Sequence, residues 1–144
     1  MLDVGAGWGA ITEHLVAARA HTLAIELHPG RARSLEARFA GQDVRVVRAD
    51  AADLWLPPRP FRVVANPPYA ATTGLIRHLT APGSRLTRAD LLVTDWVAAR
   101  WASGSGPMRR GRFETTLGRR VPARAFRPPA PRDARVLVIK RRGS

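Results

Sequence analysis

The sequence predicts an α/β fold in which parallel strands alternate with helices. Short apolar runs alternate with segments of helical periodicity through the first two thirds of the chain. Such alternation is typical of right-handed βαβ units, whose strands form one parallel sheet. A chain of 144 residues has room for one domain and one sheet, and a domain of this size buries roughly two thirds of its unfolded surface.

Seven apolar segments are expected to be strands. They are residues 2–4, 22–26, 44–48, 61–65, 89–94, 119–126 and 134–141. A short proline-rich loop, 127–132, joins the last two strands, and a connection of this length permits an antiparallel pair.

Apolar residues at helical spacing predict helices over residues 9–19, 30–39 and 72–80. Pro29 lies near the first turn of the second helix, a position that tolerates proline. Trp96, Val97 and Arg100 follow the fifth strand and suit a further helix against the sheet. We therefore expect Trp96, together with Trp101, to pack in the core.

The opening segment, residues 3–9, has the composition of a ligand-binding turn between a strand and a helix. Its glycines allow positive φ and a close approach of backbone to a ligand. Gly5 and Gly7, with Ala10, also satisfy the dinucleotide fingerprint, so the turn alone does not separate nicotinamide binding from nucleoside binding. An ordinary tight turn is the structural alternative.

Acidic residues follow the second and third strands. Glu26 is suitably placed for the two hydroxyls of a ribose, and Asp50 for the exocyclic amine of an adenine. Each acid taken singly is better explained as a solvated strand end. Together with the glycine turn they favour a nucleoside site.

The tetrad Asn66-Pro67-Pro68-Tyr69 directly follows the apolar run 61–65. If the Asn66 side-chain oxygen and the Pro67 carbonyl both accept from an NH2 group, they favour a pyramidal nitrogen with its lone pair directed at an incoming carbon. The prolines stiffen the turn because they fix φ and lack an N–H. Tyr69 can then stack on a planar base. A plain Asn-Pro turn is the alternative.

Taken together, these motifs resemble class I S-adenosylmethionine-dependent methyltransferases, and more narrowly the erythromycin-resistance methylases, which dimethylate an adenine of large-subunit ribosomal RNA. In that family a DxGxGxG loop, an acid after each of the next two strands and an N-[PIL]-P-[YF] tetrad recur in this order. Residues 126–133 also resemble the F-x-P-x-P-x-V-D segment shared with small-subunit rRNA dimethylases. They depart from it at Arg132, where the family usually has an aliphatic residue.

The resemblance implies a Rossmann-like class I methyltransferase fold, with a mostly parallel seven-stranded sheet and one antiparallel strand near the C-terminus. It implies catalytic roles for Asn66, Pro67 and Tyr69, with Phe126 as the second ring of a base pocket or, alternatively, a core aromatic. The residues expected to bind S-adenosylmethionine are Asp3, Gly5, Ala6, Gly7, Gly9, Glu26, Leu27, Asp50, Ala51 and Asn66. No metal is expected.

Positive charge is concentrated in the second half of the chain. Residues 67–144 hold 16 Lys and Arg against 4 acids, whereas residues 1–66 hold 8 Arg against 7 acids. This asymmetry is typical of a protein that binds a polyanion. The arginines of the glycine- and serine-containing loop 103–112 and of the segment after it are Arg109, Arg110, Arg112, Arg119, Arg120, Arg124 and Arg127. General use of arginine for solubility is the alternative, and the choice of RNA over DNA rests on the resemblance alone.

Several classes of function and location are disfavoured. The chain has no cysteine, which excludes thiol chemistry and cysteine-based zinc sites, and its four histidines lack ligand spacing. No apolar run is long enough to cross a bilayer, and no signal-peptide pattern precedes the first strand. We therefore expect a cytoplasmic protein that does not associate with membranes.

We expect residues 1–144 to form a single methyltransferase domain that lacks two segments usual in the family. These are a Gln-Asn-Phe type segment before the first strand and a helical C-terminal domain. Either the chain is a minimal form, or its true start lies upstream of Met1. If it is truncated, the donor loses a lid, and we expect weakened affinity or no activity. The expected partner is large-subunit ribosomal RNA before ribosome assembly, and the protein is expected to be a monomer.

Four functions remain open from the sequence. The first is an rRNA adenine-N6-methyltransferase that gives macrolide-lincosamide-streptogramin B resistance. The second is a DNA-adenine or protein-glutamine N-methyltransferase, and the third is an inactive RNA-binding fragment. The fourth, a dinucleotide oxidoreductase, leaves the tetrad and the basic half unexplained.

Overall fold

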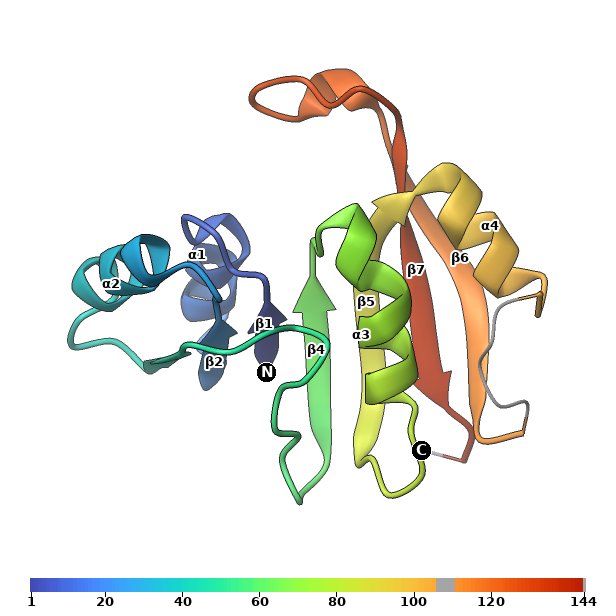
Figure 1. Ribbon diagram of the computed structural model, residues 1–144, viewed down its shortest axis with the longest axis horizontal. Coiled ribbons are helices and arrows are strands. Elements are labelled where there is room, and N and C mark those ends of the chain that lie inside the picture. The colour runs from blue at the N-terminus through green and yellow to red at the C-terminus, as the bar shows by residue number, and fades with distance from the viewer. Residues whose placement is uncertain (106–110, 144) are drawn as a thin grey trace.

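The computed structural model describes residues 1–105 and 111–143, which form one seven-stranded sheet with helices packed on it (Figure 1). The strands are β1 (Leu2–Val4), β2 (Thr22–Ile25), β3 (Val44–Val47), β4 (Phe61–Ala65), β5 (Leu86–Thr94), β6 (Phe113–Val121) and β7 (Ala134–Arg141). The helices are α1 (Ala10–Ala17), α2 (Pro29–Arg38), α3 (Thr72–Leu79) and α4 (Asp95–Ala102), with short 3-10 helices η1 (Tyr69–Ala71) and η2 (Ala123–Ala125).

The strands lie in the order β3-β2-β1-β4-β5-β7-β6. Strands β1 to β5 pair in parallel, whereas β7 runs antiparallel to both β5 and β6. The predicted mostly parallel sheet with one reversed strand is therefore confirmed. Because the first five strands point the same way, their carboxyl ends meet at one edge of the sheet, uppermost in Figure 1.

Helices cover both faces of this sheet. Leu23 and Ile25 of β2 pack into the larger core, which includes Leu79 of α3 and Trp101 of α4. Ala24, between them, packs into a smaller core with α2. Since successive side chains of a strand point to opposite faces, α2 lies on the face opposite to α3 and α4.

The sixth strand was predicted at residues 119–126, but β6 spans Phe113–Val121. This strand lies at the sheet edge, and after Phe113 its first residues, Glu114, Thr115 and Thr116, are polar, so the sequence there lacks the apolar run that marks a strand. The strand ends before Pro122, which has no N–H to donate. Asp133 then closes the loop to β7, because it accepts a 2.8 Å hydrogen bond from the Ala123 N–H and pairs with Arg120 at 2.8 Å.

The expectation for the tryptophans of α4 was half correct. Trp101 is buried in the core with 3% of its surface exposed, whereas Trp96 is 61% exposed. Val97 and Ala98 form the buried side of the first turn instead. In the part of the chain that the structure describes, no helix is both long and apolar enough to cross a membrane.

Candidate active site

A cavity of about 370 Å³ lies at the carboxyl ends of β1, β2, β3 and β4, and we call it the strand-end cavity. It sits where the strand order changes direction, the usual ligand position in open α/β sheets. Its volume is in the range of small-molecule sites, about 300–1,000 Å³. It is lined by Gly5, Gly7, Trp8, Ile25, Glu26, Leu27, Arg31, Ala49, Asp50, Ala51, Asn66, Pro68 and Ala71.

The glycine turn and the tetrad are adjacent in the lining of this cavity. Gly5 has a φ of +73°, and a Cβ on it would lie 3.8 Å from Pro68 Cδ and 3.9 Å from the Asn66 backbone oxygen. The N–H groups of Gly5 and Ala6 both donate to the Ile25 carbonyl at 2.9 Å, which holds the turn on the end of β2. Asn66 therefore lies close to the glycine turn and lines the cavity.

Glu26 is the most constrained group in the strand-end cavity, with only 4% of its surface exposed. Its Oε2 accepts from the Gly7 N–H at 2.8 Å, and its Oε1 accepts from the His28 N–H at 2.8 Å and from Arg31 Nη2 at 3.2 Å. Burial alone would raise the pKa of Glu26, but the hydrogen bonds from His28, Arg31 and Gly7 outweigh it and hold the pKa below its ordinary value. The carboxylate is therefore charged and fixed in orientation.

Asp50 also reaches the cavity and is far less constrained. It is exposed, and its Oδ1 accepts a 2.9 Å hydrogen bond from the Ala52 N–H. Its second oxygen has no hydrogen-bond partner among the described residues, so it can accept from a ligand.

Three residues predicted to bind the donor lie behind the glycine turn and do not line the strand-end cavity. Asp3 is fully buried, and its Oδ2 accepts a 2.6 Å hydrogen bond from the Thr12 hydroxyl. Ala6 packs in the smaller core. A Cβ on Gly9 would lie 2.8 Å from the Phe39 ring, so this glycine makes room for α2. Direct donor contact by these three stays a prediction.

Asp3 is in an unusual state for a carboxyl group. Its Oδ1 is buried without a hydrogen-bond partner. Burial raises the pKa of Asp3 to about 6, with the hydrogen bonding from Thr12 opposing the rise and the negative charge of Glu26 adding to it. The Asp3 side chain therefore lies buried behind the glycine turn, and at neutral pH its charged form lowers the stability of the fold.

The tetrad divides between two sites. Asn66 lines the strand-end cavity, while Pro67 is buried. The Pro68 carbonyl accepts from the Ala71 N–H at 2.9 Å and from the Thr72 hydroxyl at 3.2 Å. By contrast, the Pro67 carbonyl has no hydrogen-bond partner among the described residues, but Pro67 lines neither cavity, so its contact with the target amine stays a prediction.

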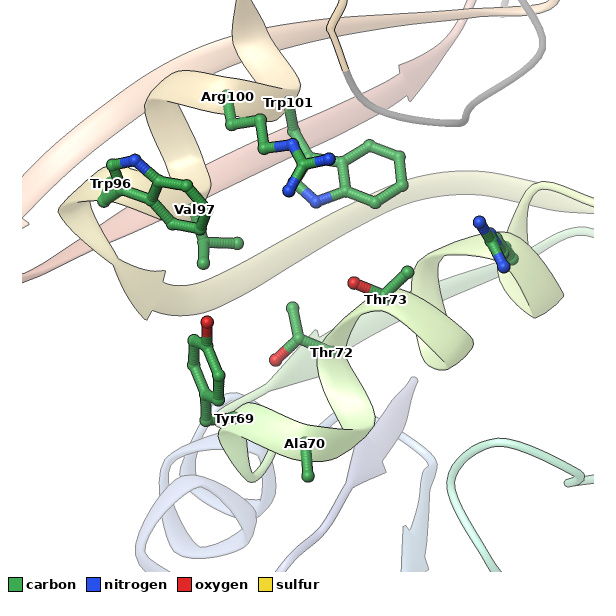
Figure 2. A pocket seen from close by; sticks show the side chains of 9 residues that line it. Tyr69, Ala70, Thr72, Thr73, Trp96, Val97, Arg100 and Trp101 are labelled. Carbon is green, nitrogen blue, oxygen red and sulfur yellow. The ribbon is translucent and has the colours of Figure 1, made fainter.

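Tyr69 lines a second cavity of about 300 Å³ between α3 and α4, which we call the aromatic cavity (Figure 2). The two cavities adjoin along the short segment 66–71, since Asn66, Pro68 and Ala71 line one and Tyr69 and Ala70 line the other. The aromatic cavity is lined by Tyr69, Ala70, Thr72, Thr73, Arg77, Trp96, Val97, Arg100 and Trp101.

Phe126 lies half-buried just after η2, in the loop that joins β6 to β7 at the carboxyl edge of the sheet. It is not among the residues that line either cavity. Its pairing with Tyr69 around a base stays a prediction.

The basic second half of the chain is largely exposed where it is described. Arg112, Arg119, Arg124 and Arg127 have exposed side chains. Arg120 is also exposed but pairs with Asp133. Arg109 and Arg110, with residues 106–108 of the same loop, lie outside the described residues.

Sequence reasoning missed Arg31, which contacts Glu26 from the first turn of α2. The signal was present, because α2 begins at Pro29, only three residues after Glu26. A side chain in the first turn of such a helix is within reach of the acid. The described residues contain no group of three or more His, Asp or Glu placed to hold a metal ion.

The strand order and the strand-end cavity define a class I methyltransferase fold. The structure of the 23S rRNA methyltransferase ErmE superposes with a TM-score of 0.86 at 26% identity, covering 99% of this chain and 61% of that one. A dimethyladenosine transferase from Plasmodium falciparum superposes with a TM-score of 0.78 at 20% identity, covering 98% and 55%. The predicted fold class is confirmed.

The chain belongs to the ribosomal RNA adenine dimethylase family, whose model matches residues 1–143. It is 38% identical to the mycinamicin-resistance protein MyrB of Micromonospora griseorubida, over 100% of this chain and 47% of that protein. It is 33% identical to an rRNA adenine N-6-methyltransferase of Corynebacterium diphtheriae, over 99% and 58%. The chain thus spans about half the length of the curated relatives it matches.

Proposed function

We propose that this chain transfers a methyl group from S-adenosylmethionine to the N6 of an adenine in 23S ribosomal RNA, giving resistance to macrolide, lincosamide and streptogramin B antibiotics. The observation that carries the proposal is that Asn66 lines one cavity with the glycine turn and both strand-end acids. The amide expected to accept a hydrogen bond from the target amine thus adjoins the groups expected to bind the donor. The family match along residues 1–143 supports the same reaction.

The strand-end cavity fits the donor by its chemistry. Seven of the ten residues predicted to bind it line this cavity: Gly5, Gly7, Glu26, Leu27, Asp50, Ala51 and Asn66. Gly5 leaves space that a side chain would fill, since a Cβ there would approach both Pro68 and Asn66. The bound donor supplies a methyl group on a positively charged sulfur.

Glu26 and Asp50 hold the two ends of the donor's adenosine. Glu26 is ionised, and Oε2 keeps one lone pair beyond the bond from Gly7, so it accepts from a ribose hydroxyl. Asp50 accepts from the adenine amine through its second oxygen. Leu27, which is 57% exposed at the cavity, provides an apolar surface for the adenine ring.

Asn66 and Pro67 act on the target amine. The Asn66 side-chain oxygen and the Pro67 carbonyl accept from the two N–H bonds of the adenine amino group, so that its lone pair points toward the methyl carbon. Alignment of this kind lowers a barrier by about 7–11 kcal/mol in favourable cases. The proton leaves to water after transfer, so no strong base is needed.

Tyr69 receives the target base by stacking. Its ring is 70% exposed and stands three residues after Asn66, where a base drawn out of the RNA reaches it. Phe126 is the proposed second ring. Chemistry on a base requires that it be unstacked, which favours loops and bulges of RNA over duplex DNA.

The exposed arginines of the second half bind the RNA backbone. Neutralising phosphates releases counterions, so binding weakens steeply as salt rises. We place the substrate as protein-free large-subunit RNA before ribosome assembly, and the active species as a monomer in the cytoplasm.

A radiolabelled methyl-transfer assay against separate pools of 23S rRNA, 16S rRNA, DNA and protein tests this function. We expect label in protein-free 23S rRNA, recovered as N6-methylated adenosine by mass spectrometry. Label in DNA or in protein glutamine instead would overturn the RNA assignment. RNA binding without any label in the four pools would show an inactive RNA-binding domain.

A further inference from the structure

Trp96 is a large aromatic side chain that is not packed in the core. It lies in the first turn of α4, and 61% of its surface is exposed, whereas Val97 and Trp101 of the same helix are buried. Its indole lines the aromatic cavity, on the α4 side, with Tyr69 on the other side (Figure 2). An exposed aromatic ring in a cavity is suited to bind a flat ligand.

Two arginines line the same cavity. Arg100 comes from the next turn of α4, and its guanidinium carbon lies 5.6 Å from the centre of the Trp96 ring. Arg77 comes from α3. Neither makes an ion pair with an acid among the described residues, so both guanidinium groups are available to an anion.

One exposed indole with two available guanidinium groups is the chemical complement of a nucleotide. Bases stack on aromatic rings whatever their sequence, and arginine binds phosphate oxygens in a bidentate manner. A cavity of about 300 Å³ is at the lower end of the range for small-molecule sites, which suits one nucleotide. Its two threonines, Thr72 and Thr73, add hydroxyl groups that can bond a sugar or a base edge.

The position of this cavity relates it to the target adenine. Tyr69 lines the aromatic cavity, and Asn66, three residues earlier, lines the strand-end cavity. An RNA strand whose target amine reaches Asn66 and whose target base stacks on Tyr69 would lie beside this cavity, with Trp96 on the far side of it from Tyr69.

We infer that the aromatic cavity binds the nucleotide next to the target adenine, with Trp96 stacked on its base and Arg100 and Arg77 on its phosphate. The inference rests on the proposed function and goes beyond it, since it assigns a second base-binding site to α4. Trp96 then contributes to the affinity for RNA, and the rate of the methyl-transfer step does not depend on it.

Steady-state methylation of a short RNA hairpin by Trp96→Ala, at saturating S-adenosylmethionine, tests this inference. We expect the KM for RNA to rise about 5–100-fold, the loss typical of one base stacked on an aromatic ring. We expect kcat and the donor Kd from calorimetry to change less than about twofold. Trp96→Tyr keeps an aromatic face and is expected to restore most of the affinity.

Two variants serve as matched controls. Trp55→Ala removes another exposed tryptophan, which lines other cavities, and Arg33→Ala removes an exposed arginine of α2. Both are expected to leave the KM for RNA within about twofold of wild type, whereas Arg100→Ala is expected to raise it and to reduce its dependence on salt.

Hairpins with an abasic residue on the 5′ or the 3′ side of the target separate this site from general RNA binding. For wild type, one of the two substitutions is expected to raise KM as much as Trp96→Ala does, and for Trp96→Ala it is expected to have no further effect. A wild type that methylates RNA with Trp96→Ala unchanged overturns the inference alone. A wild type that methylates no RNA overturns the proposed function and the inference with it.

Discussion

The backbone N–H of Gly7 donates a 2.8 Å hydrogen bond to Oε2 of Glu26. This bond ties the turn after β1 to the acid after β2, so the shape of the turn depends on a carboxylate 19 residues further along the chain. The same carboxylate is proposed to hold the donor's ribose. One side chain thus builds the site and binds its ligand.

Substituting Glu26 by Gln is expected to weaken donor binding by about 10–100-fold. The amide has one acceptor oxygen where the carboxylate has two, so either the Gly7 or the His28 N–H loses its partner, and a lost bond to a charged group costs about 1.5–3 kcal/mol. Calorimetry with S-adenosylmethionine measures the change. Glu36→Gln on the exposed side of α2 is the control, and equal Kd values for the two variants would refute the role of Glu26.

Arg31→Met is expected to tighten donor binding by about 2–10-fold, the net value of one hydrogen bond. Arg31 fills a lone pair of Glu26 Oε1 that a ribose hydroxyl could use, and its own Nε is buried without a partner. Loss of this positive charge also favours a sulfonium ligand. The gain should therefore be larger for S-adenosylmethionine than for S-adenosylhomocysteine.

The control for this change is Arg33→Met, which removes an exposed arginine from the same helix. It is expected to leave both affinities unchanged. Weaker binding of both ligands by Arg31→Met would instead mean that the main role of Arg31 is to hold Glu26 in position.

Asp3→Asn is expected to stabilise the protein at neutral pH. The pKa of Asp3 rises from its ordinary 3.8 to about 6 in the folded chain. At a pH above both values this difference lowers the free energy of unfolding by roughly 3 kcal/mol, at 1.36 kcal/mol per pKa unit. Because the folded state holds this proton more tightly, stability falls as the pH rises from 3.8 to about 6. A neutral Asn removes the cost while keeping an acceptor for Thr12.

Urea unfolding at pH 4 and at pH 7.5 measures this effect. Asp3→Asn should exceed wild type in free energy of unfolding at pH 7.5, and the two should converge at pH 4. Asp53→Asn, an exposed change, is the control. A wild-type advantage at pH 7.5 would show that the charge of Asp3 is needed for folding.

Gly9→Ala is expected to cost about 2–5 kcal/mol of stability. Its φ of +92° is strained for alanine, and the new Cβ would lie 2.8 Å from the Phe39 ring. The positive φ costs about 1–2 kcal/mol, and the crowding against Phe39 costs about 1–3 kcal/mol. Gly83→Ala separates them, because its φ is +86° with no atom within 4 Å of a Cβ. Thermal unfolding of both variants measures the packing part as the difference, and equal losses would show that Phe39 yields without cost.

The sheet and the strand-end cavity could be predicted because both depend on strand ends. An acid or a glycine placed after an apolar run lies at the carboxyl edge in any parallel sheet, so Gly5, Glu26, Asp50 and Asn66 were expected to meet, and they line one cavity. The positions of Asp3 and Gly9 were harder to predict. Strand β1 has three residues, all buried, and such a short run does not tell which face its middle side chain takes.

The exposure of Trp96 also could not be read from the sequence. Trp96 and Trp101 are five residues apart, and an apolar residue in the first turn of a helix suits either the core or the surface. The choice is made by how α4 packs on β5, β6 and β7. Side-chain geometry of this kind depends on tertiary contacts, for which the local pattern carries no signal.

Carbonyl oxygens at Asn66 and Pro67 are proposed to make the target amine reactive beside the donor. Single-turnover methyl transfer to 23S rRNA by Asn66→Ala, at saturating donor and RNA, tests it most directly. We predict a rate about 100–1,000-fold below wild type, the usual loss when one group that stabilises a transition state is removed, with donor Kd changed less than about tenfold. A rate within about threefold of wild type would contradict the account.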